Sequence, residues 1–149
     1  MRVNQVIISV FVHETEDYDK VVRSIEEFFS PEINNSKKSV KNVQGHYGNR
    51  IIIVEFKFDR KFGSKLFEKI LSKMEISEIM LIISTIDRHW YDGKLYLRFD
   101  KQYLIGENRL VLKDGDDVIR VVVSFNNTLE NIKEELKKLV SDRILYSKL

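Results

Sequence analysis

Apolar positions follow two different patterns in the first part of the chain. Residues 3–13 are rich in β-branched and aromatic side chains, which favours a well-buried strand. Between residues 18 and 29, apolar side chains recur at spacings of three and four, which predicts an amphipathic helix. Thr15 or Asp17 is placed to cap this helix, and Pro31 follows its end.

The next segment combines turns, one clear strand and a second helix. Residues 32–50 hold mainly turn-forming side chains, with a short strand expected only over residues 39–44. In residues 51–58, one set of alternate positions is apolar and the other includes Glu55 and Lys57, which predicts a half-buried strand. Asp59 is expected to cap a helix whose apolar positions continue to Met74.

The second half of the chain returns to strands. The apolar run over residues 79–90 fits a helix capped by Ser77 better than a strand. Asp92-Gly93 is a tight-turn signal, and residues 95–100 then alternate between an apolar and a polar face. This alternation predicts a strand with one solvated face.

The last segment is predicted to be two strands and a helix. Residues 110–112 fit a short strand, residues 114–117 a turn and residues 118–125 a longer strand. Asn127 or Thr128 then caps a final amphipathic helix. Because strands and helices are mixed and the late strands are joined by hairpin-like turns, we expect an α+β fold with a mostly antiparallel sheet packed against helices on one face.

Composition limits the protein class. A chain of 149 residues with 43% hydrophobic and 32% charged residues is expected to form a single folded domain over residues 1–149. The absence of cysteine excludes disulfides, thiolate chemistry and cysteine-based zinc sites. The longest apolar run, residues 79–83, is too short for a membrane span, and no signal-peptide pattern is present. We therefore expect a cytoplasmic protein without a membrane partner.

The formal net charge of +2 hides an uneven distribution. Residues 1–30 hold three Lys/Arg and six Asp/Glu, whereas residues 31–74 hold ten and four. Neighbouring loops and a helix start could gather these cations on one surface that neutralises phosphates, although lysines also keep a protein soluble. The residues expected to contact phosphates are Lys37, Lys38, Lys41, Arg50, Lys61 and Lys65.

Two further segments carry side chains suited to nucleic acid. In the loop at residues 45–50, two glycines accompany His46, Tyr47 and a cation, and these offer stacking planes and phosphate donors. The loop could equally be an ordinary hairpin turn. The polar face of the strand over residues 95–100 presents Tyr96 and Arg98, with supporting contacts expected from Lys101 and Gln102. The alternative there is a solvated sheet surface on which Arg98 pairs with Asp100.

Catalytic and metal-binding arrangements are weak. The three histidines are far apart in the sequence and lack metal-ligand spacing. Asp114, Asp116 and Asp117 carry oxygen ligands, which leaves a metal-dependent nuclease as one hypothesis, but their spacing is typical of a turn. We expect no enzyme activity, no cofactor and no metal site.

Several segments, in order, resemble a known family. They are the strand end Phe11-Val12-His13, the helix start Thr15-Glu16-Asp17, the loop Gly45-His46-Tyr47-Gly48-Asn49, residues 95–102 and Asp117-Val118-Ile119-Arg120. Together they resemble the archaeal RNA-binding proteins described as exosome-subunit-like. That family usually has proline where this chain has Arg50, so the loop loses a fixed φ and gains a cation.

The resemblance implies a small α+β domain similar to the ribosomal proteins that bind 5S RNA. It also implies RNA as the partner, without catalysis, and an association with RNA processing. The alternative is a protein-interaction or scaffold module that docks on an RNA-processing or ribosomal assembly. Because a fold does not establish a function, both hypotheses depend on where the side chains lie.

Overall fold

Strand β1 (Val3–His13) lies at the centre of an antiparallel sheet in the computed structural model, which describes residues 1–147. Across the sheet the order is β2-β3-β1-β6-β5-β4. The other strands are β2 (Lys37–Gln44), β3 (Arg50–Phe58), β4 (Trp90–Tyr91), β5 (Lys94–Asp100) and β6 (Val118–Phe125). The first strand of the chain is therefore flanked by β3 and β6, which come from distant parts of the sequence.

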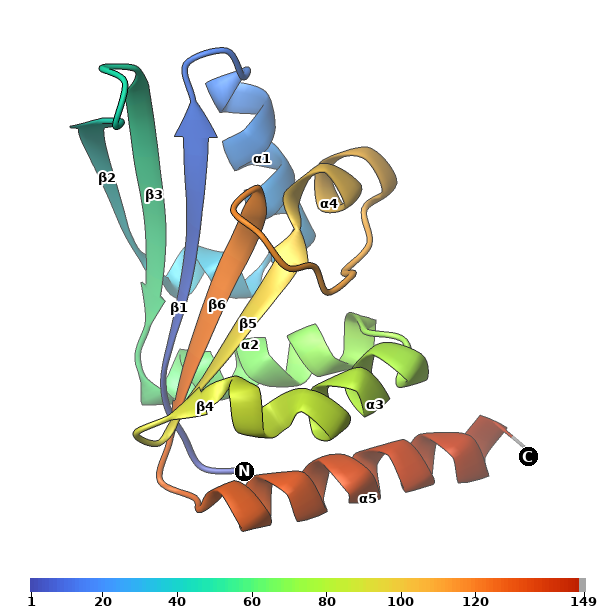
Figure 1. Ribbon diagram of the computed structural model, residues 1–149. Coiled ribbons are helices and arrows are strands. Elements are labelled where there is room, and N and C mark those ends of the chain that lie inside the picture. Colours follow the sequence, from blue (N-terminus) through green and yellow to red (C-terminus); the bar gives the residue numbers. More distant parts are fainter. Residues whose placement is uncertain (148–149) are drawn as a thin grey trace.

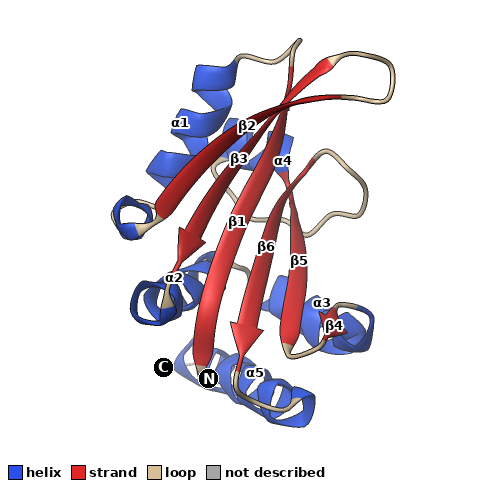
Figure 2. Ribbon diagram, turned by 90° about the vertical axis from the view of Figure 1, so that its left-hand side faces the viewer, coloured by secondary structure: helices blue, strands red, loops and turns tan. Residues whose placement is uncertain are grey.

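The α-helices of residues 1–147 all lie on one side of this sheet (Figure 1), and Figure 2 looks onto the opposite side, which none of these helices covers. They are α1 (Tyr18–Phe28), α2 (Arg60–Lys73), α3 (Ile76–Thr85), α4 (Lys101–Glu107) and α5 (Leu129–Ser147), with short 3-10 turns at Glu32–Asn35 and Ile86–Arg88. The predicted α+β class, with an antiparallel sheet and helices on one face, is confirmed. Within residues 1–147, each helix is too short or too polar to cross a bilayer.

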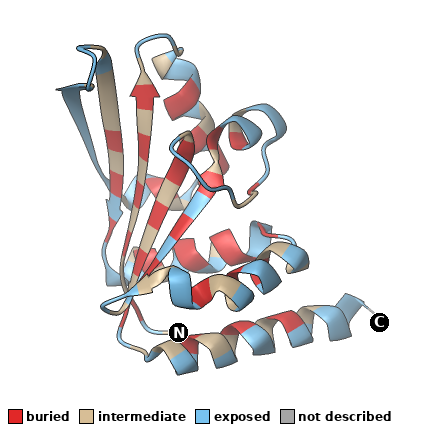
Figure 3. Cartoon of the chain, viewed as in Figure 1, coloured by how far each residue is buried: buried red, intermediate tan, exposed pale blue. Residues whose placement is uncertain are grey.

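Burial alternates along the strands, as the striped colouring of Figure 3 shows. In β1, Ile8 is fully buried, and its register partners Phe56 and Val121 belong to the same core. Ile7 points the other way and is half-buried. The helices thus cover the face that carries the large apolar side chains, and the other face stays in contact with solvent.

Aspartates mark the points where the chain enters a helix. Asp17 and Asp59 cap α1 and α2, as predicted, and Asp100 caps α4 in the same way. Thr128 Oγ1 accepts from the backbone N–H of Asn131 at the start of α5. Each cap satisfies a backbone donor that the helix itself leaves free.

The predicted helix over residues 79–90 is wrong at both ends. Ser77 lies inside α3, and Glu75 occupies the cap position. Trp90 lies in β4 and pairs with Leu95 of β5, because Asp92 and Gly93 form the predicted tight turn with φ of 52° and 75°. The Trp90 ring stacks on Phe125, so tertiary packing holds this residue in a strand.

Other boundaries also differ from the expectation. β2 begins at Lys37 and is longer than the predicted strand over residues 39–44, because it pairs with β3 along its whole length. Of the predicted strand over residues 110–112, only an isolated bridge between Leu112 and Phe99 is present. The α4 helix had no counterpart in the sequence prediction.

Lys101 lies in the protein interior, contrary to its expected role as an exposed contact. Its side chain is only 1% exposed. Nζ lies 2.8 Å from a carboxylate oxygen of Glu16, 2.8 Å from one of Asp117 and 3.0 Å from the Phe11 carbonyl oxygen. The exposed Gln102 donates to Asp117 at 3.2 Å. These bonds join the start of α4 to the β1–α1 turn and to the start of β6.

This arrangement lowers the pKa of both carboxylates. Burial alone raises the pKa of Glu16, but hydrogen bonds from Lys101 and from the His13 backbone, with the Lys101 charge, hold it below its ordinary value. Burial likewise acts to raise the pKa of Asp117, and the bonds from Lys101 and Gln102 lower it overall. A lowered folded-state pKa stabilises the fold above the ordinary carboxyl pKa of about 4, and this stabilisation is lost as pH falls below that value.

We expect Ile8→Ala to lower the free energy of unfolding by about 2–5 kcal/mol, because it leaves a cavity in the core. Ile7→Ala, one residue earlier on the uncovered face, should cost about 1 kcal/mol or less. Urea unfolding followed by circular dichroism measures both values. Equal losses would contradict the assignment of one covered and one uncovered face.

We expect Lys101→Met to cost about 2–4 kcal/mol near neutral pH, because it leaves two partly buried carboxylates without their cation. The difference from the unsubstituted protein should shrink below about pH 4, where protonation removes the same ion pairs. Urea unfolding across pH tests this. The exposed neighbour Gln102 is the control, and Gln102→Ala should cost about 1 kcal/mol or less. A pH-independent loss in Lys101→Met would show that the charge pairing is not its cause.

Candidate functional site

The uncovered side of the sheet, here called the open face, carries an excess of cations. It consists of the alternate strand residues that point away from the helices. Among these strand positions, the basic residues are Lys37, Lys41, Lys57, Lys94, Arg98 and Arg120. The acidic ones are Glu55 and Asp100. Six cations against two carboxylates make this face attractive to an anionic partner.

An aromatic and guanidinium pair lies near the middle of the open face. The Arg120 guanidinium lies 4.7 Å from the ring centre of Phe11 on β1. Its Nη2 is 3.8 Å from the exposed carboxylate of Asp116, whereas Nη1 is buried and has no hydrogen-bond partner in residues 1–147. The guanidinium plane is therefore held in place by packing and keeps an unused donor.

A pocket opens where the outer edge of β5 is incompletely covered. Two adjoining cavities, of about 180 and 270 Å³, share the residues Arg88, His89, Tyr96, Leu97 and Arg98. One cavity extends toward α3 and residues 112–114, and the other extends over the open face toward Arg120. We call these two cavities the β5 pocket. It connects the sheet edge with the cationic face.

Of the cations that line this pocket, Lys113 lies 3.7 Å from Asp100 and Arg120 lies 3.8 Å from Asp116, whereas the two arginines nearest the shared part of the pocket have no carboxylate partner among the described residues. In the part of the chain that the structure describes, neither Arg88 nor Arg98 forms an ion pair. The alternative pairing of Arg98 with Asp100 is not formed. Asp100 instead caps α4 and lies 3.7 Å from Lys113. Both guanidinium groups are thus available to an external anion.

The open face also holds part of the predicted basic group. Lys37 and Lys41 lie on β2, at one edge of the sheet, whereas Tyr96 and Arg98 lie on β5 near the other edge. These strands are separated by four strand spacings of about 4.8 Å, which is about 19 Å. The two predicted groups therefore share one face but not one groove.

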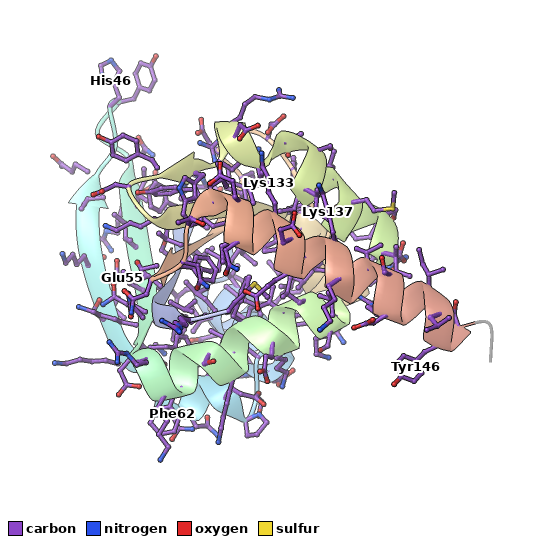
Figure 4. All side chains as sticks on the ribbon, turned by 90° about the horizontal axis from the view of Figure 1, so that it is seen from below. His46, Glu55, Phe62, Lys133, Lys137 and Tyr146 are labelled. Atoms are coloured by element: carbon purple, nitrogen blue, oxygen red, sulfur yellow. The ribbon has the colours of Figure 1, made fainter. Side chains whose placement is uncertain are left out.

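The predicted loop lies at the tip of the β2–β3 hairpin, where His46 projects away from the body of the protein (Figure 4). Tyr47 is 91% exposed, and its ring meets that of His46 edge to face at 4.9 Å. Arg50 is exposed where β3 begins. The tip presents two aromatic rings to solvent, as the residue types predicted.

The remaining predicted cations point elsewhere. Lys38 lies on the helix-facing side of β2, with Nζ 3.4 Å from Glu26 and above the Phe56 ring. Lys61 and Lys65 are exposed on α2, which covers the opposite side of the sheet from the open face. The structure therefore does not gather the basic segment into a single surface.

Several open-face residues have no counterpart in the sequence-based site. Lys57, Lys94 and Arg120 reach this face only through strand pairing, and Arg88 reaches the pocket through the turn after α3. The alternation of polar and apolar positions in β3, β5 and β6 was a usable signal for the first three. No local pattern indicated Arg88.

One group of side chains has the geometry of a metal site. Ligand atoms of His13, Glu16 and Asp117 lie within 4.8 Å of one another. However, the Lys101 ammonium already lies 2.8 Å from each of the two carboxylates and offsets one of their two negative charges. Asp116 is fully exposed and lies nearest to Arg120. The carboxylates are thus engaged in a structural ion pair.

The chain is similar to known proteins along most of its length. A family model described as "RNA binding" matches residues 5–125. An uncharacterised protein of Methanocaldococcus jannaschii is 37% identical over 148 residues, which cover 95% of this chain and 97% of that protein. A Pyrococcus abyssi protein named as an RNA-binding protein is 29% identical over 134 residues, covering 81% of this chain and 80% of that protein.

A crystal structure has the same fold. It is that of a Sulfolobus solfataricus protein of the family model DUF54, with a TM-score of 0.87 and 64% sequence identity. The match covers 94% of this chain and 99% of that chain. The family model matches well over half of the chain, and the chain therefore belongs to the family described as RNA binding.

Proposed function

We propose that this protein binds RNA through the open face, without catalysing a reaction on it. The observation that carries the proposal is a sheet face that none of the described helices covers and whose strand positions hold six cations and two carboxylates. Neutralising RNA phosphates with lysine and arginine releases counterions, which favours binding. Membership of the family described as RNA binding supports the same conclusion.

The two edges of the open face would contact different parts of the RNA. Lys37, Lys41 and Lys57 present mobile ammonium groups along β2 and β3, which suits phosphate contacts of no fixed geometry. Tyr96 and Arg98 present planar groups on β5, which suit bases and ribose. The Arg120–Phe11 pair lies between these edges and adds a further plane. Bound RNA would cross the strands from one edge to the other.

The hairpin tip extends this surface. His46 and Tyr47 are exposed aromatic rings, and Arg50 is a nearby exposed cation. Because the tip projects from the body, it would reach RNA beyond the sheet. We propose an RNA-processing setting and a likeness to the 5S-RNA-binding ribosomal proteins from the family resemblance alone.

A second candidate function is docking of a protein partner, which one observation favours. A shallow groove of about 530 Å³ lies between α2 and α5, and Met1, Leu71 and Leu139 line its apolar part. Exposed apolar patches of this kind occur at protein interfaces. A partner that remains bound after nuclease treatment, and is released by Leu139→Asp, would favour this function over RNA binding.

We expect RNA binding to weaken steeply with salt. Each phosphate contact contributes roughly 0.7 to the slope of log affinity against log salt for single strands. The double variant Lys37→Ala/Lys41→Ala should therefore lower that slope by about 1.4, and Arg98→Ala should weaken binding by about 1–3 kcal/mol. Fluorescence anisotropy with a short labelled RNA measures both quantities.

The matched control is Lys61→Ala/Lys65→Ala, which removes the same charge from α2 on the other side of the sheet. It should leave both the affinity and the salt slope nearly unchanged. A flat salt response, or a control as damaging as the β2 variant, would contradict binding through the open face.

A further inference from the structure

The β5 pocket contains main-chain groups that the sheet does not use. Tyr96 donates its backbone N–H to the His89 carbonyl at 2.8 Å, so the backbone N–H and carbonyl of Tyr96 both point outward from the sheet edge. In a regular hairpin His89 would return a bond to the Tyr96 carbonyl. Its N–H instead donates to Ile86 at 2.9 Å, where the 3-10 turn ends. Trp90 lies opposite Leu95, so its own N–H points away from β5.

Residues 111–113 form hydrogen bonds with the same edge of β5, beginning two residues after Tyr96. The Arg98 carbonyl accepts from the Lys113 N–H at 3.0 Å, and Asp100 donates to the Val111 carbonyl at 2.8 Å. Nothing in this second segment reaches the Arg98 N–H. Among the described residues, the Tyr96 carbonyl and the Arg98 N–H therefore have no bonding partner, and they face the gap between the two segments.

The side chains around this gap combine flat and cationic groups. Tyr96 is 40% exposed, and Arg98 and Arg88 are exposed residues without ion pairs in the described chain. Asp114 is the single carboxylate among the described residues that line either cavity. A ligand that fits would combine a flat ring, a polar edge and a negative charge.

Resting on the proposed function, we propose that the β5 pocket holds one unpaired nucleotide of the bound RNA. The base would contact the Tyr96 ring, and its polar edge would bond the free Tyr96 carbonyl and Arg98 N–H. Arg88 and Arg98 would neutralise the adjoining phosphates. A base in a duplex has its polar edge paired and its faces stacked, so it cannot enter. The protein therefore selects single-stranded or looped RNA over paired RNA.

Fluorescence anisotropy on the full chain tests this selection with two probes, a short labelled single-stranded RNA and the same strand annealed to its complement. The protein should bind the single strand about tenfold more tightly, because one stacked base is worth roughly this factor. Tyr96→Ala should lose about tenfold on the single strand and little on the duplex. Tyr96→Phe, which retains the ring, should bind as the unsubstituted protein does.

The matched control is Tyr103→Ala. Tyr103 has the same 40% exposure as Tyr96 but lies on α4, on the helix-covered side. It should leave binding of both RNAs unchanged. A 2-aminopurine base within the single strand provides a second measurement, since its fluorescence should fall on binding to the unsubstituted protein and not on binding to Tyr96→Ala.

The outcomes separate the two proposals. Equal affinity for both RNAs, with no effect of Tyr96→Ala, would overturn the nucleotide pocket and leave RNA binding by the open face intact. Failure to bind either RNA would overturn both. Adenosine or uridine monophosphate that binds as tightly as the single strand would show a site for free nucleotides and would also overturn the proposal.

Discussion

The rest of the structure depends on burial of one face of the central strand. From Val6 to Val12, every second residue of β1, including Ile8 and Val10, is buried beneath the helices. Because side chains of a strand alternate between its faces, this burial sends the intervening residues to the other side. The open face is therefore a direct consequence of helices that cover only one side of the sheet.

This one-sided architecture also separates the charges by role. Lys101 enters the helix-covered interior and joins three segments through Glu16 and Asp117, so its charge is paired within the fold. Arg98, three residues earlier, lies on the open face and makes no ion pair among residues 1–147. A net charge of +2 thus conceals one cation that supports the fold and another that is available to a ligand.

Local signals were sufficient for most elements. Asp17 and Asp59 were recognisable as helix caps, and Asp92-Gly93 as a hairpin turn, because each depends on a few neighbouring residues. The predicted elements were wrong where contacts between residues far apart in the chain determine the local structure. Trp90 sits in a strand because it stacks on Phe125, and β2 extends to Lys37 because β3 pairs with it throughout. Neither partner can be identified from local periodicity.

By itself, the sequence determined the fold class, the residue types suited to an anionic partner and the family resemblance. Only the tertiary structure decided which of those residues share a surface. Strand order brings Arg120 beside Arg98, while helix packing turns Lys65 to the other side of the sheet. The break in the edge of β5 is likewise invisible in the sequence. It exists because two segments, at residues 86–91 and 111–113, each cover the edge only in part, and that depends on contacts between residues far apart in the chain.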